Sequence, residues 1–363
     1  MNTKKIPRQD KVLKSGLWPA LLLVAALLMS CVMPKAQNEL LVMSYNVQNL
    51  FDDRLDGTEY REYDPGKGHW TGEDYQAKLE ALVRVLRSVS TQEPDILALQ
   101  EVENSRALID LLKTGGFNYP WKVMVPAPAS AVNTALLSRL PVKRVHVHHL
   151  SLFDGQAVRP VVEVEIQAGQ GLLVVFVNHW KSKSGGQELT EPSRMEAAAI
   201  ITRRLAYWQG ADPLADILVL GDFNEQGFDR FPDDVSFHQA ILHETSLFAA
   251  KDGFQGLLTT GCLGSPLFQI QQSLFDPYYE APEKNPGSYV FRGQWLAYDK
   301  ILMNQGLFNN QGLSYIKDSF HVHKNEFLLS QKGFPLGWRN SSASGFSDHL
   351  PVIARFYLES DGD

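Results

Sequence analysis

Short apolar runs recur along the chain after residue 40 and are separated by turn-forming or helical segments. Their enrichment in leucine and β-branched residues predicts strands. The runs Leu172–Val177 and Ile217–Leu220 are continuously apolar, which predicts burial on both faces, whereas the alternating run Val161–Ile166 predicts a strand with one wet face. The predicted strands lie near residues 40, 96, 134, 143, 161, 172, 217, 300 and 350.

Two further segments, Asp74–Val89 and Ser193–Trp208, have the periodicity of helices. A hydroxyl residue followed three positions later by an acid is the pattern of a capping box, and Thr71 and Ser193 each begin such a pattern. Many strands with few helices indicate two β-sheets that pack on each other and are covered by helices. Polar residues at the ends of the strands are then where we expect chemistry.

The first 30 residues have the pattern of an export signal, because five Lys or Arg residues precede the charge-free run Leu17–Met33. A spanning helix needs roughly 20 apolar residues, and Pro19 and Ser30 interrupt this shorter run. A cleaved signal is therefore favoured over membrane embedding. The sequence "LLMSC" resembles the lipobox of bacterial lipoproteins, which are cut before an acylated cysteine, here Cys31; a simple secretory signal is the alternative.

We therefore expect a signal peptide over residues 1–30, a short tether over 31–39 and one domain over 40–358. No linker-like composition or internal repeat divides the chain after residue 40. Cys262 would be the only other cysteine, which leaves no intrachain disulfide framework. We expect a monomer whose stability comes from its core.

Composition and charge limit the classes of binding partner that we expect. With 44% hydrophobic and 21% charged residues, the chain has the make-up of an ordinary globular protein. The formal net charge of −7 becomes −11 once residues 1–30 are removed. Proteins that hold long nucleic acids use many Lys and Arg contacts to phosphates, so this chain lacks their general footprint, although a local positive cleft stays open.

Polar residues follow several of the predicted buried strands. The strands near residues 40, 96, 172 and 217 end in Asn46, Glu101, Asn178–His179 and Asp222 with Asn224. Each such residue taken alone is commonly a turn or a cap. Together they predict a polar pocket at one edge of the sheets.

Six motifs strengthen this prediction: "SYNVQNLFD", "DILALQEVEN", "FVNHWKSKSGG", "LVLGDFNE", "YDKILMN" and "GFSDHLPV". In order and approximate spacing they resemble the endonuclease/exonuclease/phosphatase superfamily, and the similarity runs from Leu40 to Phe356. The resemblance implies a DNase I-like, four-layer α/β sandwich in which two packed β-sheets are flanked by helices. It also implies hydrolysis of a phosphoester with a divalent metal.

The resemblance assigns a metal site. Glu101 matches the principal metal-binding glutamate, Asn46 the asparagine that supports the ion or its water, and Asp348 a further acidic group nearby. Hard oxygen ligands suit Mg²⁺, with Mn²⁺ or Ca²⁺ as alternatives. Gln48 stands where many members carry an acid; it can hydrogen-bond a metal-bound water but adds no charge, which favours one ion over two.

The resemblance also assigns the reacting groups. Asp222 and Asn224 match the pair that orients the attacking water and holds the phosphate, with Asp222 a candidate acceptor of the water's proton. His349 matches the histidine that contacts the phosphoryl oxygen or assists the attack, and Asp299 the carboxylate that orients it. A histidine oriented by an acid handles protons near neutral pH.

A second histidine and a loop complete the predicted site. His179 matches the histidine that protonates the leaving group or clamps the phosphate, and the alternative is an ordinary strand-end histidine. Lys181 and Lys183 lie in a Ser/Gly-rich loop that suits phosphate binding, although a solvated surface loop is nearly as good an interpretation.

The functional hypothesis is an exported phosphodiesterase, with a nuclease as the first substrate class. A phospholipid, sphingomyelin or inositol-phosphate phosphoesterase is the alternative, and a non-catalytic surface-binding lipoprotein that kept the fold is the second. We expect a phosphodiester substrate, either a nucleic acid or a small ester. We also expect a membrane attachment through Cys31 in a bacterial cell envelope, with a secreted or periplasmic enzyme as the alternative.

Overall fold

The computed structural model describes residues 38–127, 130–151, 158–213, 215–227, 240–243, 258–263, 273–280 and 282–358. From Glu39 onward these residues belong to one unit. The predicted signal peptide, Cys31 and most of the predicted tether lie outside the described residues and stay predictions. None of the helices that the structure describes is long and apolar enough to cross a membrane.

Within the described residues, the first sheet has seven strands in the order β15-β17-β1-β2-β4-β3, with β16 paired to the start of β17. β1 and β2 run parallel, and β4 runs antiparallel to β2. The strands are β1 (Asn38–Leu50), β2 (Ile96–Val102), β3 (Trp121–Val125), β4 (Asn133–Ser138), β15 (Leu313–Tyr315), β16 (His321–Val322) and β17 (Val352–Leu358).

The second sheet, as far as it is described, has eight strands in the order β5-β6-β7-β8-β14-β11-β10-β9. β7 and β8 run parallel, and β14 runs antiparallel to β8. Its strands are β5 (Val142–His148), β6 (Val161–Ala168), β7 (Gly171–His179), β8 (Asp216–Asp222), β9 (Ile241–His243), β10 (Leu258–Gly261), β11 (Leu274–Phe275) and β14 (Asp299–Met303); β12 (Tyr289–Phe291) and β13 (Gln294–Leu296) form a separate hairpin.

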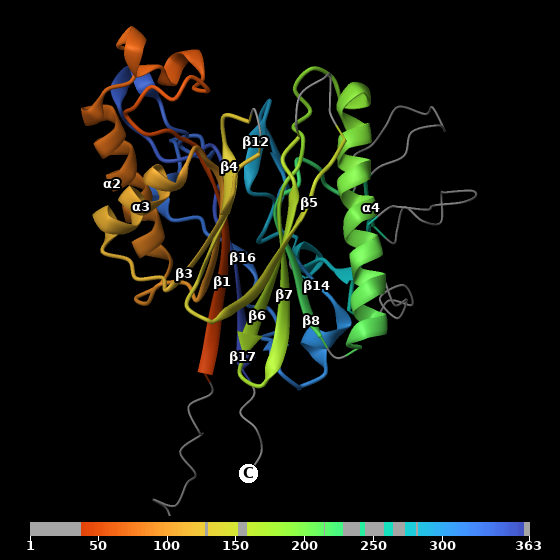
Figure 1. The fold of residues 1–363 in the computed structure, drawn as a ribbon. Helices are drawn as coiled ribbons and strands as arrows, with labels where there is room; N and C mark the ends of the chain where they lie inside the picture. The colour runs from red at the N-terminus through yellow and green to blue at the C-terminus, as the bar shows by residue number, and fades with distance from the viewer. Residues whose placement is uncertain are drawn as a thin grey trace, which may run out of the picture. The chain divides into compact units, whose positions relative to one another are not determined.

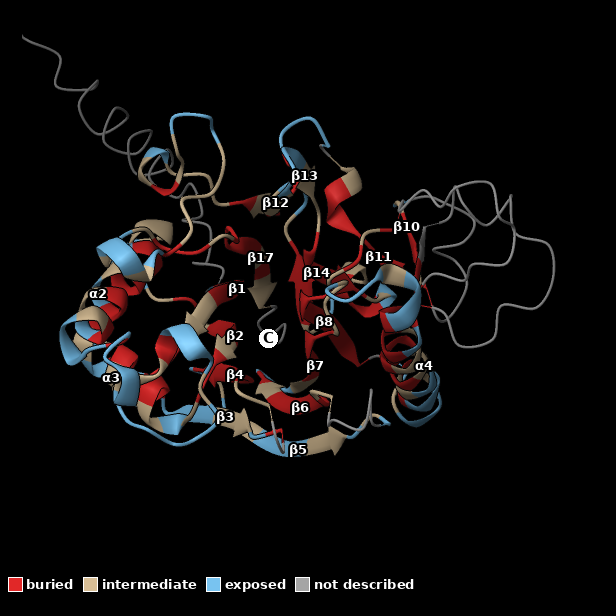
Figure 2. Ribbon diagram, turned by 90° about the horizontal axis from the view of Figure 1, so that it is seen from above, coloured by how far each residue is buried: buried red, intermediate tan, exposed pale blue. Residues whose placement is uncertain are grey.

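Helices cover the outer faces of the two sheets. Figure 1 shows α2 and α3 outside the first sheet and α4 outside the second, and Figure 2 shows the same four layers from above. This confirms the predicted four-layer α/β sandwich. The helices are α2 (Gly72–Val89), α3 (Ser105–Gly115) and α4 (Gln187–Ala211), and the short 3₁₀ helices are η1 (Arg61–Tyr63), η2 (Pro65–Lys67), η3 (Pro277–Tyr279), η4 (Gln305–Phe308), η5 (Glu326–Leu328) and η6 (Asn340–Ser342).

The strand β7 shows how the sequence specifies these layers. Leu173, Val175 and Val177 pack in the core between the two sheets, whereas Val174 and Phe176 pack in the core beneath α4. Successive side chains of a strand point to opposite faces, so a strand between two cores needs a continuous apolar run. The prediction that β7 is buried on both faces is confirmed.

The predicted wet face of β6 is wrong. Glu163 is 0% exposed, because α4 lies over this face of the sheet. Arg204 donates two hydrogen bonds to its carboxylate, at 2.7 and 2.8 Å, and the Trp208 indole donates a third at 2.7 Å. The ring of His148 on β5 lies 2.7 Å from the same carboxylate. A buried carboxylate with this many donors is stable in a core, although its sequence pattern resembles a solvated strand.

The helices follow the sequence in part. The capping box of α2 is confirmed, because Thr71 accepts from the Asp74 N–H and the Asp74 carboxylate accepts from the Thr71 N–H. The cap predicted at Ser193 is wrong, since α4 begins at Gln187. The buried Arg194 guanidinium donates to the Gln187 carbonyl oxygen at 3.4 Å. This contact holds the first turns of α4, which lie before the predicted cap at Ser193.

Candidate active site

The strand pairings bring the predicted site residues to one edge of both sheets. His179 is paired with Asp222 at the carboxyl ends of the parallel strands β7 and β8, and Asp299 at the start of β14 is paired with Asp222 from the other side. In the first sheet Asn46 is in register with Gln100, one residue before Glu101. The close approach of β7 and β8 requires the glycine of "GDFN", because a Cβ on Gly221 would lie 2.0 Å from the Asn178 carbonyl oxygen.

Asn46 links the two sheets. Its side-chain N–H₂ donates to Glu101 Oε1 at 3.0 Å and to Asp222 Oδ2 at 2.9 Å, and its Oδ1 accepts from the Gln48 N–H at 3.0 Å. The other Glu101 oxygen accepts from the Asn49 N–H at 2.9 Å. Two carboxylates from different sheets are thus held within reach of one amide.

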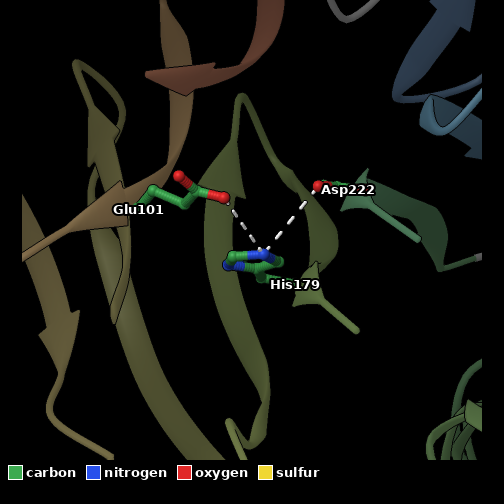
Figure 3. A group of neighbouring side chains, drawn as sticks. All are labelled: Glu101, His179 and Asp222. Carbon is green, nitrogen blue, oxygen red and sulfur yellow. Dashed lines mark ion pairs between the residues drawn. The ribbon is translucent and has the colours of Figure 1, made fainter. Parts of the chain in front are cut away.

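His179 lies between these two carboxylates (Figure 3). Its Nε2 is 3.7 Å from Glu101 Oε1 and 3.8 Å from Asp222 Oδ2. The ligand atoms of Glu101, His179 and Asp222 all lie within 4.8 Å of one another. His179 Nδ1 is buried and has no hydrogen-bond partner among the described residues. This group faces a common point, as side chains around an ion do.

His349 forms the second part of the site. Its Nδ1 lies 2.7 Å from Asp299 Oδ2, which also accepts a hydrogen bond from the Ser288 hydroxyl at 2.6 Å. Its Nε2 points toward Asp222, 3.9 Å from Oδ2. One face of its ring lies against the Tyr289 ring, with centroids 4.6 Å apart. Ser288 and Tyr289 are site residues that the sequence reasoning missed.

Asp348 is placed by contacts to its backbone. Its N–H donates to Gln48 Oε1 at 2.9 Å, and the Trp338 N–H donates to the same oxygen at 2.7 Å. The fully buried Lys78 on α2 donates to the Phe346 carbonyl oxygen at 2.7 Å. Gln48 therefore holds the loop that carries Asp348 and His349, and its ability to hydrogen-bond a metal-bound water stays a prediction.

Asn224 and the two lysines lie beside this centre. The Asn224 N–H donates to Asp222 Oδ1 at 2.8 Å, and its side-chain amide donates to the Trp180 carbonyl oxygen at 3.2 Å. Lys183 Nζ lies 5.6 Å from the centroid of the Tyr298 ring, and the Lys181 carbonyl oxygen accepts from Arg194 at 2.9 Å. Phosphate binding by Lys181 and Lys183 stays a prediction.

Comparison with known proteins gives the family. A sequence profile of the endonuclease/exonuclease/phosphatase family matches residues 41–248, more than half of the chain. The chain belongs to this family. Members of the family are phosphoester hydrolases that use divalent metals. No curated protein sequence matches the chain.

Solved structures share the fold of this family member at low sequence identity. TDP2 from Caenorhabditis elegans superimposes with a TM-score of 0.52 at 16% identity over 99% of this chain and 98% of that chain. An endonuclease/exonuclease/phosphatase from Bacteroides vulgatus gives 0.51 at 13% identity over 89% and 100%, respectively. The human Nocturnin catalytic domain with bound sulfate gives 0.50 at 14% identity over 88% and 95%.

Arg159 is a charged residue of this family member's site that the sequence analysis missed. Its guanidinium donates to the carbonyl oxygens of His179 and Trp180 at 3.1 and 3.3 Å, and its charge acts on Glu101 and Asp222. It precedes β6 rather than following a strand. Because β6 is antiparallel to β7, the start of β6 lies at the same edge as the end of β7. An arginine before an apolar strand, as in "VRPVV", is the signal that identifies it.

Burial and charge move the pKa values of the site in opposite directions. Burial raises the pKa of Asp222 to about 7, and burial with the nearby Asp348 charge raises that of Glu101. Burial lowers the pKa of His179 well below its ordinary value, with Arg159 adding to the effect. The pKa of His349 is raised well above its ordinary value although burial opposes this, because Asp299, Asp222 and Asp348 surround the ring. A neutral histidine and a cationic histidine thus lie on either side of Asp222.

The backbone of the site is unusual. Gln48, Asn49, Glu101 and Asn224 all have positive φ, between 50° and 66°, although none is glycine. The register of β2 against β4 shifts between Gln100 and Val102, which marks a bulge at Glu101. A bulge turns a side chain out of the pleat at a strand end. These conformations aim the site residues into a common space.

The donor set fits a divalent cation. Glu101 and Asp222 offer carboxylate oxygens, the kind of ligand that Mg²⁺ and Mn²⁺ take, and His179 offers a neutral ring nitrogen. The predicted ligand Asp348 is not part of this group, and its charge acts on Glu101. Two buried atoms here, His179 Nδ1 and Asp299 Oδ1, have no partner within the part of the chain that the structure describes.

Proposed function

We propose that the protein is an exported phosphodiesterase with nuclease activity. The observation that carries this proposal is the position of Asp222. It lies between a group that suits a divalent cation, Glu101 with His179, and a carboxylate-oriented histidine, His349 with Asp299. Hydrolysis of a phosphodiester needs a neutralised phosphate, an activated water and a protonated leaving group, and these two halves supply such groups.

Glu101 would hold the cation beside Asp222 and His179, and Asp348 would add negative charge nearby. Bound there, the cation would neutralise phosphate charge and lower the pKa of a water. Asp222 would accept the proton of the attacking water, because its raised pKa matches proton transfer near pH 7. Asn46 and Asn224 donate to its two oxygens and hold it in place.

His349 and Arg159 would bind the phosphoryl oxygens. The His349 ring carries a proton on Nε2 in its cationic form, while Asp299 accepts from Nδ1, so the ring presents an N–H toward Asp222 and the reacting phosphate. Arg159 brings a permanent positive charge near Glu101. His179 is neutral at pH 7, and its Nε2 lies 3.8 Å from Asp222 Oδ2, so it would take the proton that Asp222 accepts from the water and pass it to the leaving oxygen.

The charge of the chain supports a nuclease for short or single-stranded substrates over one that grips long duplexes. A mature net charge of −11 gives the chain no general excess of Lys and Arg that could contact the phosphates of a long duplex. Hydrolysis of nucleic acid should then depend weakly on salt. A rate that falls by several orders of magnitude between low and physiological salt would contradict this substrate class.

The test compares three variants of the full chain. His349→Ala and Asp222→Asn should abolish Mg²⁺-dependent hydrolysis of a chromogenic phosphodiester with circular dichroism unchanged, and His146→Ala, on the half-exposed strand β5, should keep full activity. A panel of DNA, RNA, sphingomyelin and inositol phosphate then identifies the substrate. Full activity of either site variant, or undiminished activity in EDTA, contradicts the mechanism.

We further propose that residues 1–30 are removed and that Cys31 is acylated, which would anchor the enzyme in the cell envelope. Fatty-acid labelling of the full chain tests this, with Cys31→Ser as the control. Label that is retained in Cys31→Ser, or wild-type protein that stays in the soluble fraction, contradicts the anchor.

A further inference from the structure

The hairpin β12–β13 lies beside the predicted catalytic groups. Figure 2 shows it next to β14 and β17, the strands that begin near Asp299 and His349. Tyr289, at the start of β12, forms an isolated bridge with His349, and its ring stacks on that histidine. The Tyr289 ring also stacks on that of Tyr298, with centroids 5.6 Å apart. The hairpin therefore forms a wall of the site.

Phe291 continues this wall outward. Tyr289 and Phe291 are two residues apart on one strand, so they share a face and lie about 7 Å apart along it. The opposite face is occupied, because the Trp295 ring packs near Phe334, with centroids 6.2 Å apart. The Phe291 ring is 52% exposed, so the face that carries the Tyr289–His349 contact ends in an open aromatic ring.

The tip of the hairpin is cationic and not apolar. Arg292 is exposed, and its guanidinium lies 5.2 Å from the centroid of the Phe291 ring. Arg292 and Gly293 both have positive φ, as the tight turn between paired Phe291 and Gln294 requires. An exposed aromatic ring can stack on a nucleobase, and a guanidinium next to it can contact a neighbouring phosphate. Phe291 and Arg292 place both groups beside the proposed catalytic site.

We propose that Phe291 is a stacking platform for the nucleobase next to the scissile phosphate, with Arg292 contacting the adjoining phosphate. This inference rests on the proposed nuclease function and narrows its substrate to single-stranded nucleic acid, whose bases are free to stack. Stacking adds about 1–3 kcal/mol per base to the binding free energy, a contribution separate from the contacts of basic residues to phosphates.

Tyr207 on α4 offers a matched control. Its ring is also 52% exposed and also has a guanidinium over it, that of Arg204 at 4.0 Å, but it belongs to the helix layer outside the second sheet. Phe291→Ala, Phe291→Leu, Phe291→Trp and Tyr207→Ala are made in the full chain. The ligands are a short single-stranded oligonucleotide and a strand of equal length built from abasic units.

Two readouts are used: fluorescence anisotropy of labelled strands without metal, and KM with Mg²⁺. Removing one stacked base contact should raise Kd and KM for the oligonucleotide by about 5- to 150-fold. Phe291→Ala should leave the affinity for the abasic strand and the melting temperature of the protein unchanged. Phe291→Trp should restore binding, Phe291→Leu should not, and Tyr207→Ala should match the wild type.

Several results overturn the platform. If Phe291→Ala binds the oligonucleotide as tightly as the wild type does, or loses as much affinity for the abasic strand as for the oligonucleotide, Phe291 does not stack on a base. Restored function in Phe291→Leu, with slower hydrolysis of phosphodiester lipids in vesicles by Phe291→Ala, assigns the ring to a lipid surface instead. A wild type that hydrolyses no phosphodiester refutes the proposed function, whereas the anisotropy comparison still decides whether Phe291 stacks on bases.

Discussion

The substitution Glu163→Gln tests the buried ion cluster that fastens α4 to the second sheet. The carboxylate is fully buried and receives hydrogen bonds from Arg204 and Trp208, with the His148 ring beside it. Despite the cost of burial, these partners lower the pKa of Glu163 from 4.5 to about 2. The substitution keeps the shape of the side chain but removes its charge.

The shift sets the size of the effect. The pKa of Glu163 differs by about 2.5 between its ordinary value and the folded state, and each pKa unit corresponds to 1.36 kcal/mol. The charged carboxylate therefore contributes roughly 3 kcal/mol to the folding free energy at pH 7. Because the folded-state pKa is lowered, this contribution is present above pH 4.5 and is lost as the pH falls toward 2. At pH 2.5 less than about 1 kcal/mol of it should remain.

Urea denaturation at pH 7 and at pH 2.5, followed by circular dichroism, measures both values. Glu165→Gln is the matched control, because Glu165 lies two residues along the same strand and pairs with the half-exposed His146 at 3.0 Å. We expect the control to change stability by less than about 1 kcal/mol. A loss below about 1 kcal/mol for Glu163→Gln at pH 7, or a loss that does not shrink at pH 2.5, refutes the reasoning.

The remaining predictions concern the site. Asp299→Asn should lower kcat for a small phosphodiester by about 100-fold or more, since His349 loses the carboxylate that orients and charges it, and a kcat within threefold of wild type would exclude that role. Glu101→Gln should raise the Mg²⁺ concentration for half-maximal activity, and an unchanged titration curve would show that the ion is held elsewhere. At subsaturating metal the rate should rise with pH up to about 7 as Asp222 ionises, and a rate that falls over this range in steady-state assays would contradict Asp222 as the base.

The sequence predicts the sheets well, because burial on both faces requires uninterrupted apolar runs such as those of β7 and β8. It also predicts that polar residues meet at the strand ends, since parallel neighbours finish at the same edge. Asn46, Glu101, His179 and Asp222 are four such residues, and the structure brings them together.

What the sequence could not show are partners supplied from distant segments. Glu163 looks solvated until Arg204, 41 residues later, lies over it. Gln48 looks like a substituted metal-shell residue until its amide oxygen is found to accept from Trp338 and Asp348, 290 and 300 residues away. Arg159 precedes its strand, so a search of strand ends passes over it. Pairings of this kind depend on the order of strands in the sheets, which local pattern does not specify.

The left-handed backbone at the strand ends has a consequence for protein engineering. A non-glycine residue in this region costs roughly 1–2 kcal/mol relative to glycine, and Glu101 is one of four such residues at the site. Glu101→Gly should therefore relax the chain while removing the principal metal ligand. A library selected only for thermal stability would enrich that variant and other glycine substitutions at the site. The selected proteins would be more stable but inactive. Selection for durable enzymes from this scaffold has to score turnover in the same round as thermal survival.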